Sequence, residues 1–311
     1  MASYPLGVVI PTFNRSQVLL LCLQHLERQT WKDFEVVVVD DGSRDDTADV
    51  VTEFASKSQL RLRYIRQENA GPARARNRGI ATLRSPVCVM IGDDILVCPS
   101  FLDTHLKFHQ LNRKRHAAGL GFTCWSDSGQ TVTRFMKWLD ESGVQFSYGD
   151  LLRGAPPNWQ HFYTSNLSLK TEFLIENPFD ESFTAAAVED IELAYRLEHT
   201  CGLEMTFLPT ATAEHIHPTT FGQACRRMFA VGRSTRRFHH LWPASEQTSS
   251  RHSVFFRISR ALLLKNRWLL SLLTWTAGSL TPYWCPNPLM WPVLRAHFVL
   301  GYQRAAPPLS S

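Results

Sequence analysis

The sequence predicts an α/β protein with a Rossmann-like, mostly parallel central sheet flanked by helices. Apolar runs of strand length alternate with segments of helical periodicity, an alternation that implies right-handed crossovers between parallel strands. The runs are continuous enough to be buried on both faces. Polar sequence follows three of the first four runs. Because ligands bind at the carboxyl ends of such strands, the sequence also predicts where a functional site lies.

The first four strands and their connecting helices follow one another closely. Ser16 is expected to cap the first helix, and Asp46 or Thr47 the second, because short polar side chains accept hydrogen bonds from first-turn amides. Pro72 fits the first position of the third helix, where a missing amide hydrogen is tolerated. We expect strands at Val8–Ile10, Phe34–Val39, Leu60–Tyr64 and Val87–Ile91, and the first helix at Ser16–Gln29.

The same alternation continues downstream. Glu189 and Asp190 open a helix whose N-terminal dipole favours negative charge, and Gly202 fits the position that ends it. Capping explains these two acids, although a capped carboxylate is also well positioned for chemistry. The other expected elements are helices at Pro99–His116 and Val132–Glu141, strands at Leu120–Trp125, Tyr163–Leu169 and Met205–Leu208, and a loop at Gly143–Gln160.

Two adjacent carboxylates, Asp93 and Asp94, follow the fourth strand directly after Gly92. Hard oxygen ligands at a strand end suit Mg²⁺ or Mn²⁺ carrying a phosphate substrate. A solvated acidic turn is the alternative, and for an isolated pair it is the commoner one. Polar sequence also ends the first strand, at Pro11–Arg15, and the second, at Asp40–Ser43. Since these strand ends meet at one edge of the sheet, we predict a site there.

His215 and His217 form a second cluster of candidate ligands. Two residues apart in an extended chain, both imidazoles lie on one face. A metal-binding role and a structural hydrogen-bonding role both remain open.

The cysteines and the N-terminus indicate a compartment. The seven cysteines are scattered without CxxC spacing, which argues against a disulfide framework and a zinc site and favours a cytoplasmic protein with reduced thiols. The N-terminal residues carry no charged segment followed by a cleavable apolar one, so we expect no signal peptide.

The last third of the chain is basic. Residues 215–311 contain 12 Lys and Arg but the single acid Glu246, whereas the whole chain carries a formal charge of only +5. No nucleic-acid recognition motif accompanies this charge. The apolar stretch 261–281 is interrupted by Lys265–Arg267 and is too short to span a bilayer. Peripheral attachment to an anionic membrane surface and a helical pair packed on the body or on a second subunit are both consistent with the nearby Trp268, Trp275, Trp284 and Trp291.

Seven short motifs occur in an order that is typical of one enzyme family. They are Val9–Arg15, Asp40–Ser43, Asn69–Asn77, Asp93–Asp94, Asn166–Ser168, Phe179–Glu181, and Glu189–Asp190 with Leu193 and Arg196. Over residues 5–232 the chain resembles the family 2 inverting glycosyltransferases of the GT-A fold. The family's commonest metal motif is Asp-x-Asp, and here Gly92 stands at its first position.

The resemblance implies roles for residues of the donor half. Asp41 would accept from the nucleobase, Arg76 would lie near the base or the diphosphate, and Asp93 would bind the donor ribose. The residues that would line the nucleoside pocket are Pro11, Thr12, Asn14 and Arg15.

The resemblance also implies the catalytic groups. Asp94 would bind Mg²⁺ or Mn²⁺ on the diphosphate, with His215 or His217 completing the metal shell. Asp190 would be the general base, with Glu189 beside it. The acceptor pocket would include Asn166 and Trp159.

Together these roles imply an inverting hexosyltransferase that moves sugar from a nucleotide-diphospho-sugar, first of all a UDP-sugar, to a hydroxyl of a carbohydrate or lipid-linked acceptor in polysaccharide or glycolipid biosynthesis. Residues 1–125 would bind the donor, 126–232 would bind the acceptor and carry the base, and 233–311 would form a basic, Trp-rich helical extension. One alternative is a catalytically impaired nucleotide-sugar-binding or scaffold protein, which the glycine at position 92 favours. The other is a nucleotidyltransferase, although Pro11–Arg15 lacks the glycine-rich loop typical of that class.

Overall fold

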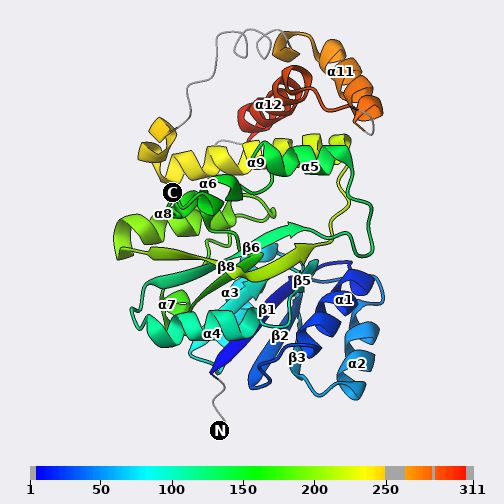
Figure 1. Cartoon of the computed structure of the whole chain (residues 1–311). Helices are drawn as coiled ribbons and strands as arrows, with labels where there is room; N and C mark the ends of the chain where they lie inside the picture. The colour runs from blue at the N-terminus through cyan, green and yellow to red at the C-terminus, as the bar shows by residue number, and fades with distance from the viewer. Residues whose placement is uncertain (1–4, 249–262, 282–283, 306–311) are drawn as a thin grey trace. The chain divides into compact units, whose positions relative to one another are not determined.

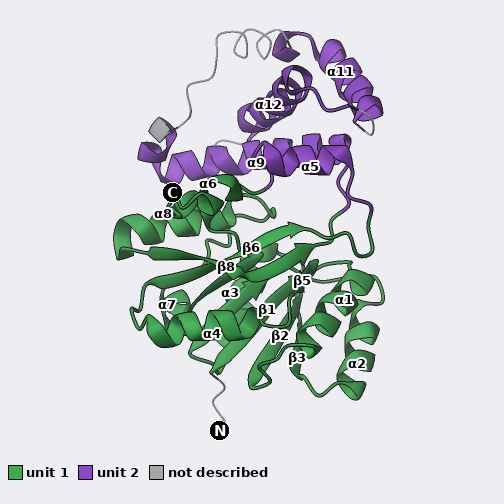
Figure 2. Cartoon of the chain, viewed as in Figure 1, with its two compact units in different colours: residues 1–130, 146–217 green, residues 131–145, 218–311 purple. Residues whose placement is uncertain are grey.

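The computed structural model of the chain describes residues 5–248, 263–281 and 284–305 (Figure 1). It contains two compact units, coloured separately in Figure 2. Unit 1 comprises residues 1–130 and 146–217, and unit 2 comprises residues 131–145 and 218–311. The expected division by role, at residues 125 and 232, stays a prediction. The expected start of the apolar stretch at residue 261 lies outside the described residues.

Unit 1 is built on one sheet of eight strands in the order β3-β2-β1-β4-β7-β6-β8-β5. The first four strands pair in parallel, while β7 is antiparallel to β4 and to β6. β8 runs parallel to β6 and antiparallel to β5. The strands are β1 Leu6–Thr12, β2 Phe34–Asp40, β3 Arg61–Arg66, β4 Val87–Ile91, β5 Ile95–Val97, β6 Ala117–Trp125, β7 Asn166–Lys170 and β8 Glu204–His215.

Helices cover both faces of this sheet, as expected. Alternate residues of each central strand enter two separate cores: Val9 and Val37 pack toward α3, α7 and α8, whereas Val8 and Val36 pack toward α1, α2 and α4. The helices of unit 1 are α1 Ser16–Glu27, α2 Thr47–Lys57, α3 Pro72–Thr82, α4 Phe101–Leu111, α6 Tyr148–Leu152, α7 Thr171–Glu176 and α8 Glu189–Cys201, with a short 3₁₀ turn η1 at Trp159–His161.

Several local predictions can be compared with these bounds. Pro72 is the first residue of α3, and Gly202 ends α8 with a left-handed φ of 66°, so both predictions are confirmed. Ser16 as an N-cap is wrong, because Arg15 holds that position and Ser16 lies inside the first turn. The expected loop at Gly143–Gln160 contains the short helix α6, and α4 is shorter than predicted at both ends.

Unit 2 is helical in its described part. It contains α5 Arg134–Glu141, α9 Phe221–Leu241, the 3₁₀ turn η2 Pro243–Thr248, α11 Arg267–Leu280 and α12 Asn287–Arg304. Two glycines let α9 and α12 cross closely, since a Cβ on Gly232 would lie 2.0 Å from the carbonyl oxygen of Phe298 and one on Gly301 1.9 Å from that of Phe229. Within the described ranges, no helix combines the length and apolar character needed to cross a bilayer.

Candidate active site

The paired carboxylates lie at the carboxyl ends of β1 and β4, as predicted. Thr12, the last residue of β1, donates a hydrogen bond from Oγ1 to Oδ2 of Asp93 at 2.8 Å. Arg15, at the start of α1, donates from Nη1 to Oδ1 of Asp93 at 3.0 Å and to Oδ2 of Asp94 at 2.5 Å. Asp93 and Asp94 are 5% and 8% exposed, so this cation offsets two nearly buried negative charges.

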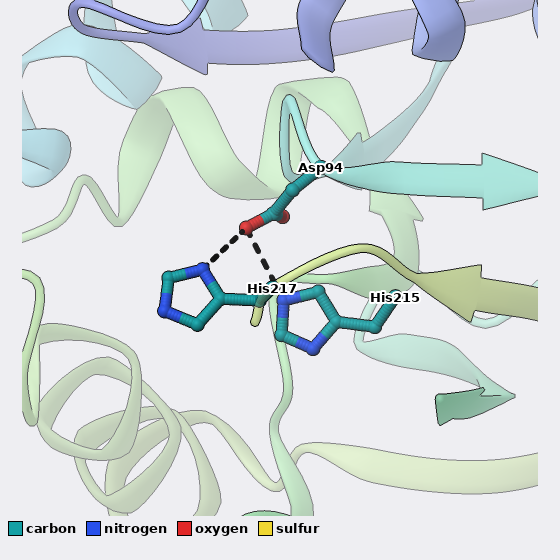
Figure 3. A group of neighbouring side chains, drawn as sticks. All are labelled: Asp94, His215 and His217. Carbon is teal, nitrogen blue, oxygen red and sulfur yellow. Dashed lines mark ion pairs between the residues drawn. The ribbon is translucent and has the colours of Figure 1, made fainter. Parts of the chain in front are cut away.

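β8 brings the two histidines to the same place. The antiparallel pairing of β5 with β8 puts Ile95 opposite His215, and the amide of Ile216 donates to the carbonyl of Asp94 at 2.9 Å. The imidazoles of His215 and His217 stack with their centroids 5.4 Å apart, so the prediction that they share one face is confirmed. Figure 3 shows both rings turned toward the carboxylate of Asp94.

Asp94, His215 and His217 form a candidate metal-binding set. Each offers one ligand atom, and the three atoms lie within 4.8 Å of one another. Nε2 of His215 is 3.2 Å and Nδ1 of His217 is 3.4 Å from Oδ2 of Asp94. One carboxylate and two imidazoles suit Mn²⁺ better than Mg²⁺, which prefers oxygen ligands. Three protein ligands leave coordination positions for a substrate, so the residues fit a catalytic ion.

The surrounding structure fixes the position of His215. Its ring stacks on that of Trp125 at 5.2 Å, and the side chain of Gln130 and the amide of Ser126 donate to its carbonyl oxygen at 2.7 Å and 3.1 Å. Among the described residues, no partner reaches its buried Nδ1. We therefore assign the ring proton to Nε2, which faces Asp94.

The environment shifts the pKa values of the two aspartates in opposite directions. Burial, together with the charge of Asp94, raises the pKa of Asp93 to about 6. Burial would raise the pKa of Asp94 as well, but His215 first and then Arg15 oppose it, and that pKa is held well below its usual range. Asp94 is thus ionised at neutral pH, as a metal ligand must be.

Gly92 allows Asp94 its observed position. A Cβ on Gly92 would lie 2.7 Å from Oδ1 of Asp94, closer than ordinary contact permits. A larger residue would displace the carboxylate that faces the histidines. The glycine at the first position of the family motif therefore agrees with a site built around Asp94 alone.

The two acids predicted for catalysis, Glu189 and Asp190, open α8. Glu189 is buried, and its Oε1 accepts from Nη1 of Arg76 at 2.8 Å. Asp190 is half-buried, and its Oδ1 accepts from the amide of Ile191 at 2.9 Å. The residue before them, Val188, has a φ of 73°, a strained left-handed conformation for a β-branched side chain. Strain of this kind is concentrated at functional sites.

A chain of ring contacts runs from the metal-binding set toward Asp190. The ring of His215 lies 6.0 Å from that of Phe146, which lies 5.0 Å from that of Tyr163. Burial, with the negative charge of Asp190 nearby, raises the pKa of Tyr163 to about 12. Asp190 therefore lies within electrostatic range of a side chain that is two ring contacts away from His215.

Comparison with known proteins identifies the family. Residues 7–165, half of the chain, match the family described as "Glycosyl transferase family 2". The chain belongs to this family. The "Validoxylamine A glucosyltransferase" of Streptomyces hygroscopicus subsp. jinggangensis (strain 5008) is 35% identical over 229 residues, 65% of this chain and 53% of that protein. The "Chondroitin synthase" of Pasteurella multocida (strain Pm70) is 29% identical over 220 residues, 62% and 23% of the two chains.

This family 2 glycosyltransferase matches about half or less of the length of these relatives. Solved structures confirm the predicted GT-A fold. The mannosyltransferase PcManGT from Pyrobaculum calidifontis, in complex with GDP-Man and Mn²⁺, superimposes with a TM-score of 0.61 at 17% identity over 96% of this chain and 86% of that chain. TarS 1-349 from S. aureus, in complex with UDP, gives a TM-score of 0.52 at 15% identity over 96% and 89%.

Other predicted donor residues of the glycosyltransferase shape the loops at the same sheet edge. Asp41 accepts from the amides of Ala70 and Gly71 at 3.0 Å and 2.8 Å, and from Gln67 at 2.7 Å, so it holds the loop before α3. Asn14 has a left-handed φ of 54° and accepts from the amide of Arg44 at 2.7 Å. Contacts of these residues and of Pro11 with a nucleoside stay predictions.

The residues predicted for the acceptor occupy different environments. Asn166 has no exposed surface, and its amide donates to the carbonyls of Phe122 and Ala211 at 3.1 Å and 2.9 Å, so it fastens β7 to its neighbouring strands. This burial gives Asn166 a structural role, and its predicted role in acceptor binding stays a prediction. Trp159 is only half-buried, with its ring 5.2 Å from that of Tyr195, and its role in acceptor binding stays a prediction.

Three neighbours of the site were not predicted from the sequence. Trp125, Phe146 and Tyr163 lie between or against the predicted residues, yet none belongs to a motif or to a regular spacing of polar residues. Trp125 ends the strand β6, and Phe146 and Tyr163 lie in the segment between α5 and β7, where aromatic residues are equally typical of a core.

Proposed function

We propose that this enzyme is an inverting glycosyltransferase that uses a nucleotide-diphospho-sugar donor and a divalent cation. The observation that carries the proposal is the grouping of Asp94, His215 and His217 at one edge of the sheet. Of these three residues, Asp94 lies within residues 7–165, which match the family model. Asp190 in the same unit supplies a carboxylate for the acceptor.

Asp94 and His217, with His215 beside them, would hold the cation. A bound cation supplies positive charge to the departing diphosphate. Residues of the chain would keep the cation in place: Asp94 stays ionised, and the neighbouring Asp93 accepts a hydrogen bond from Thr12. Imidazole ligands make Mn²⁺ the preferred ion.

Asp190 is proposed as the base that takes the proton of the attacking hydroxyl. It is half-buried and lies in the first turn of a helix, two residues after the strained Val188. Glu189 is a poor candidate for a nucleophile or a second base, because its carboxylate forms a buried ion pair with Arg76. A single base without a protein nucleophile leads to inversion of the anomeric centre, by analogy with inverting hydrolases.

The donor is proposed to be a UDP-sugar, with GDP- and dTDP-sugars as the alternatives. The solved relatives were crystallised with GDP-Man or UDP, which supports nucleoside diphosphates as a class. Hydrolysis of UDP-, GDP- and dTDP-sugars in the presence of Mn²⁺, followed by release of the nucleoside diphosphate, tests the choice. Binding of these donors without any turnover would favour the impaired scaffold protein, and release of pyrophosphate from a nucleoside triphosphate would favour the nucleotidyltransferase.

The acceptor is proposed to be a carbohydrate or lipid-linked hydroxyl in polysaccharide or glycolipid biosynthesis. A glucosyltransferase and a chondroitin synthase among the relatives support a sugar-like acceptor. A cytoplasmic setting, expected from the scattered cysteines of the sequence, is part of this proposal.

Unit 2 is proposed to attach the enzyme peripherally to an anionic membrane surface. On α11, Trp268, Leu272 and Trp275 follow one another at helical spacing and are 69%, 46% and 71% exposed. A pocket of about 670 Å³ beside this face is lined by residues that include Trp275, Arg267 and Arg304. Exposed tryptophans with arginines and without acids are typical of helices that lie in a membrane interface.

Flotation with vesicles containing anionic lipid tests the attachment. The full chain should float with these vesicles and stay behind with neutral ones, and Trp268→Ser with Trp275→Ser should lose the difference. The matched control is Leu111→Ser on α4, where the side chain is 89% exposed. Unchanged flotation of the double variant would contradict the assignment of this face.

A further inference from the structure

Arg15 contacts the same atoms that would bind the cation. Its Nη1 lies 2.5 Å from Oδ2 of Asp94, and its Nη2 lies 2.8 Å from Nδ1 of His217. Oδ2 and Nδ1 are also the pair of atoms that face each other at 3.4 Å within the metal-binding set. A single guanidinium therefore bridges two of the three prospective ligands.

The contact with His217 excludes a metal ion at the same atom. An arginine can only donate, so Nδ1 of His217 must accept with its lone pair. A neutral imidazole has only one such lone pair, and metal ligation uses it too. Arg15 and a cation therefore cannot bind Nδ1 of His217 at the same time.

The side chain of Arg15 is exposed enough to move away from Asp94 and His217. Its side chain is 34% exposed, whereas those of Asp93 and Asp94 are 8% and 12% exposed. The anchor at the start of α1 keeps the guanidinium near the site after its departure. A planar guanidinium binds a diphosphate bidentately, so the donor is a ready partner for the released side chain.

We propose that Arg15 and the divalent cation are alternative occupants of one site, so that ion binding must displace the guanidinium from Asp94 and His217. Arg15 thus neutralises the aspartates when no ion is bound and becomes free to hold the donor diphosphate when one is. This inference rests on the proposed function, because it takes Asp94 and His217 as ligands of the catalytic ion.

Binding of Mn²⁺ alone, measured by isothermal titration calorimetry, tests the proposal without any turnover. Arg15→Gln should bind Mn²⁺ about tenfold more tightly or better, since one charge-assisted hydrogen bond is worth about a decade of affinity. Arg15→Lys should also bind more tightly, because one ammonium keeps the charge but cannot span Asp94 and His217 together. Arg113→Gln, at an exposed arginine just after α4, should bind like the parent enzyme.

The possible results distinguish the displacement of Arg15 from the existence of the ion site. Equal affinities in the parent and both Arg15 variants would overturn the displacement while leaving the ion site intact. Tighter binding in Arg15→Gln alone would also overturn it, because charge rather than occupancy would then explain the effect. No Mn²⁺ binding in any protein would refute the ion site itself and, with it, the metal-assisted mechanism. Circular dichroism confirms that each variant is folded.

Discussion

A buried series of side-chain hydrogen bonds beneath the candidate active site predicts that the folded protein loses stability in acid. Nε2 of His105 donates to Oδ1 of Asn166 at 3.0 Å, and Oγ of Ser168 donates to Nδ1 of His105 at 2.8 Å. His109 in turn donates to Oγ of Ser168 at 2.9 Å. Asn166 continues the chain to the carbonyl of Ala211 in β8, the strand that carries His215. Protonating His105 would convert Nδ1 from an acceptor to a donor, opposite the hydroxyl of Ser168 that donates to it.

The size of the loss in folding stability follows from the shift in the pKa of His105. Burial lowers the pKa of His105 to about 4, whereas an unfolded chain has a histidine pKa of about 6.5. Because the folded-state pKa is depressed, the stabilisation is complete above pH 6.5 and is lost as pH falls toward about 4. A difference of one bound proton between the folded and unfolded states changes the free energy of unfolding by about 1.4 kcal/mol per pH unit. His105 therefore accounts for a loss of roughly 3 kcal/mol in the free energy of unfolding across this window.

Urea unfolding of the full chain between about pH 7 and about pH 4 measures this loss. His105→Gln keeps a donor and an acceptor but removes the titrating group, so its free energy of unfolding should fall less steeply with acidification, by about 1.4 kcal/mol per pH unit. His199→Gln, at an exposed position in α8, is the matched control and should follow the parent enzyme. Parallel pH profiles for His105→Gln and the parent enzyme would refute the reasoning.

Four further predictions concern the active site. Asp190→Asn should lower kcat by about two to four orders of magnitude while UDP binding persists, and a near-normal kcat would remove Asp190 from the mechanism. Asp94→Ala should abolish Mn²⁺ binding in calorimetry and turnover with it, whereas full activity of the parent enzyme in excess chelator would show that no ion is needed. His217→Ala should weaken Mn²⁺ binding more than His215→Ala, because ligation through Nε2 of His215 would leave a buried proton on Nδ1 without an acceptor among the described residues, and equal losses would contradict this order. Gly92→Ala should weaken Mn²⁺ binding by displacing Asp94, and an unchanged affinity would show that the carboxylate adapts.

Periodicity and strand ends were enough to predict the sheet edge on which the site lies. Val87–Ile91 could be identified as a buried strand because every residue is apolar, and a parallel sheet then places Asp93 near the end of β1. The spacing of His215 and His217 likewise predicted that their rings share one face. These features depend on local sequence and on the geometry common to all such sheets.

Contacts between distant residues could not be predicted in the same way. Arg15 and His217 are 202 positions apart, and they meet through the pairing of β1 with β4 and the register of β5 against β8. The burial of Asn166 depends on His105, which lies on a helix 61 positions earlier and shows no polar periodicity. Family position suggested an acceptor residue there, but tertiary packing gives it a structural role.

The arrangement at the start of α8 favours Asp190 over Glu189 as the proposed base. Glu189 is 3% exposed and faces Arg76, so removing its partner would leave a buried charge uncompensated. A carboxylate that is buried and paired in this way offers little surface to an acceptor hydroxyl. Asp190 lies one residue further along the helix, about 100° around its axis, and is half-buried. The buried pair thus anchors the turn that follows the strained Val188, and we expect this anchoring to keep the carboxylate of Asp190 in a defined position from which it could reach an acceptor hydroxyl.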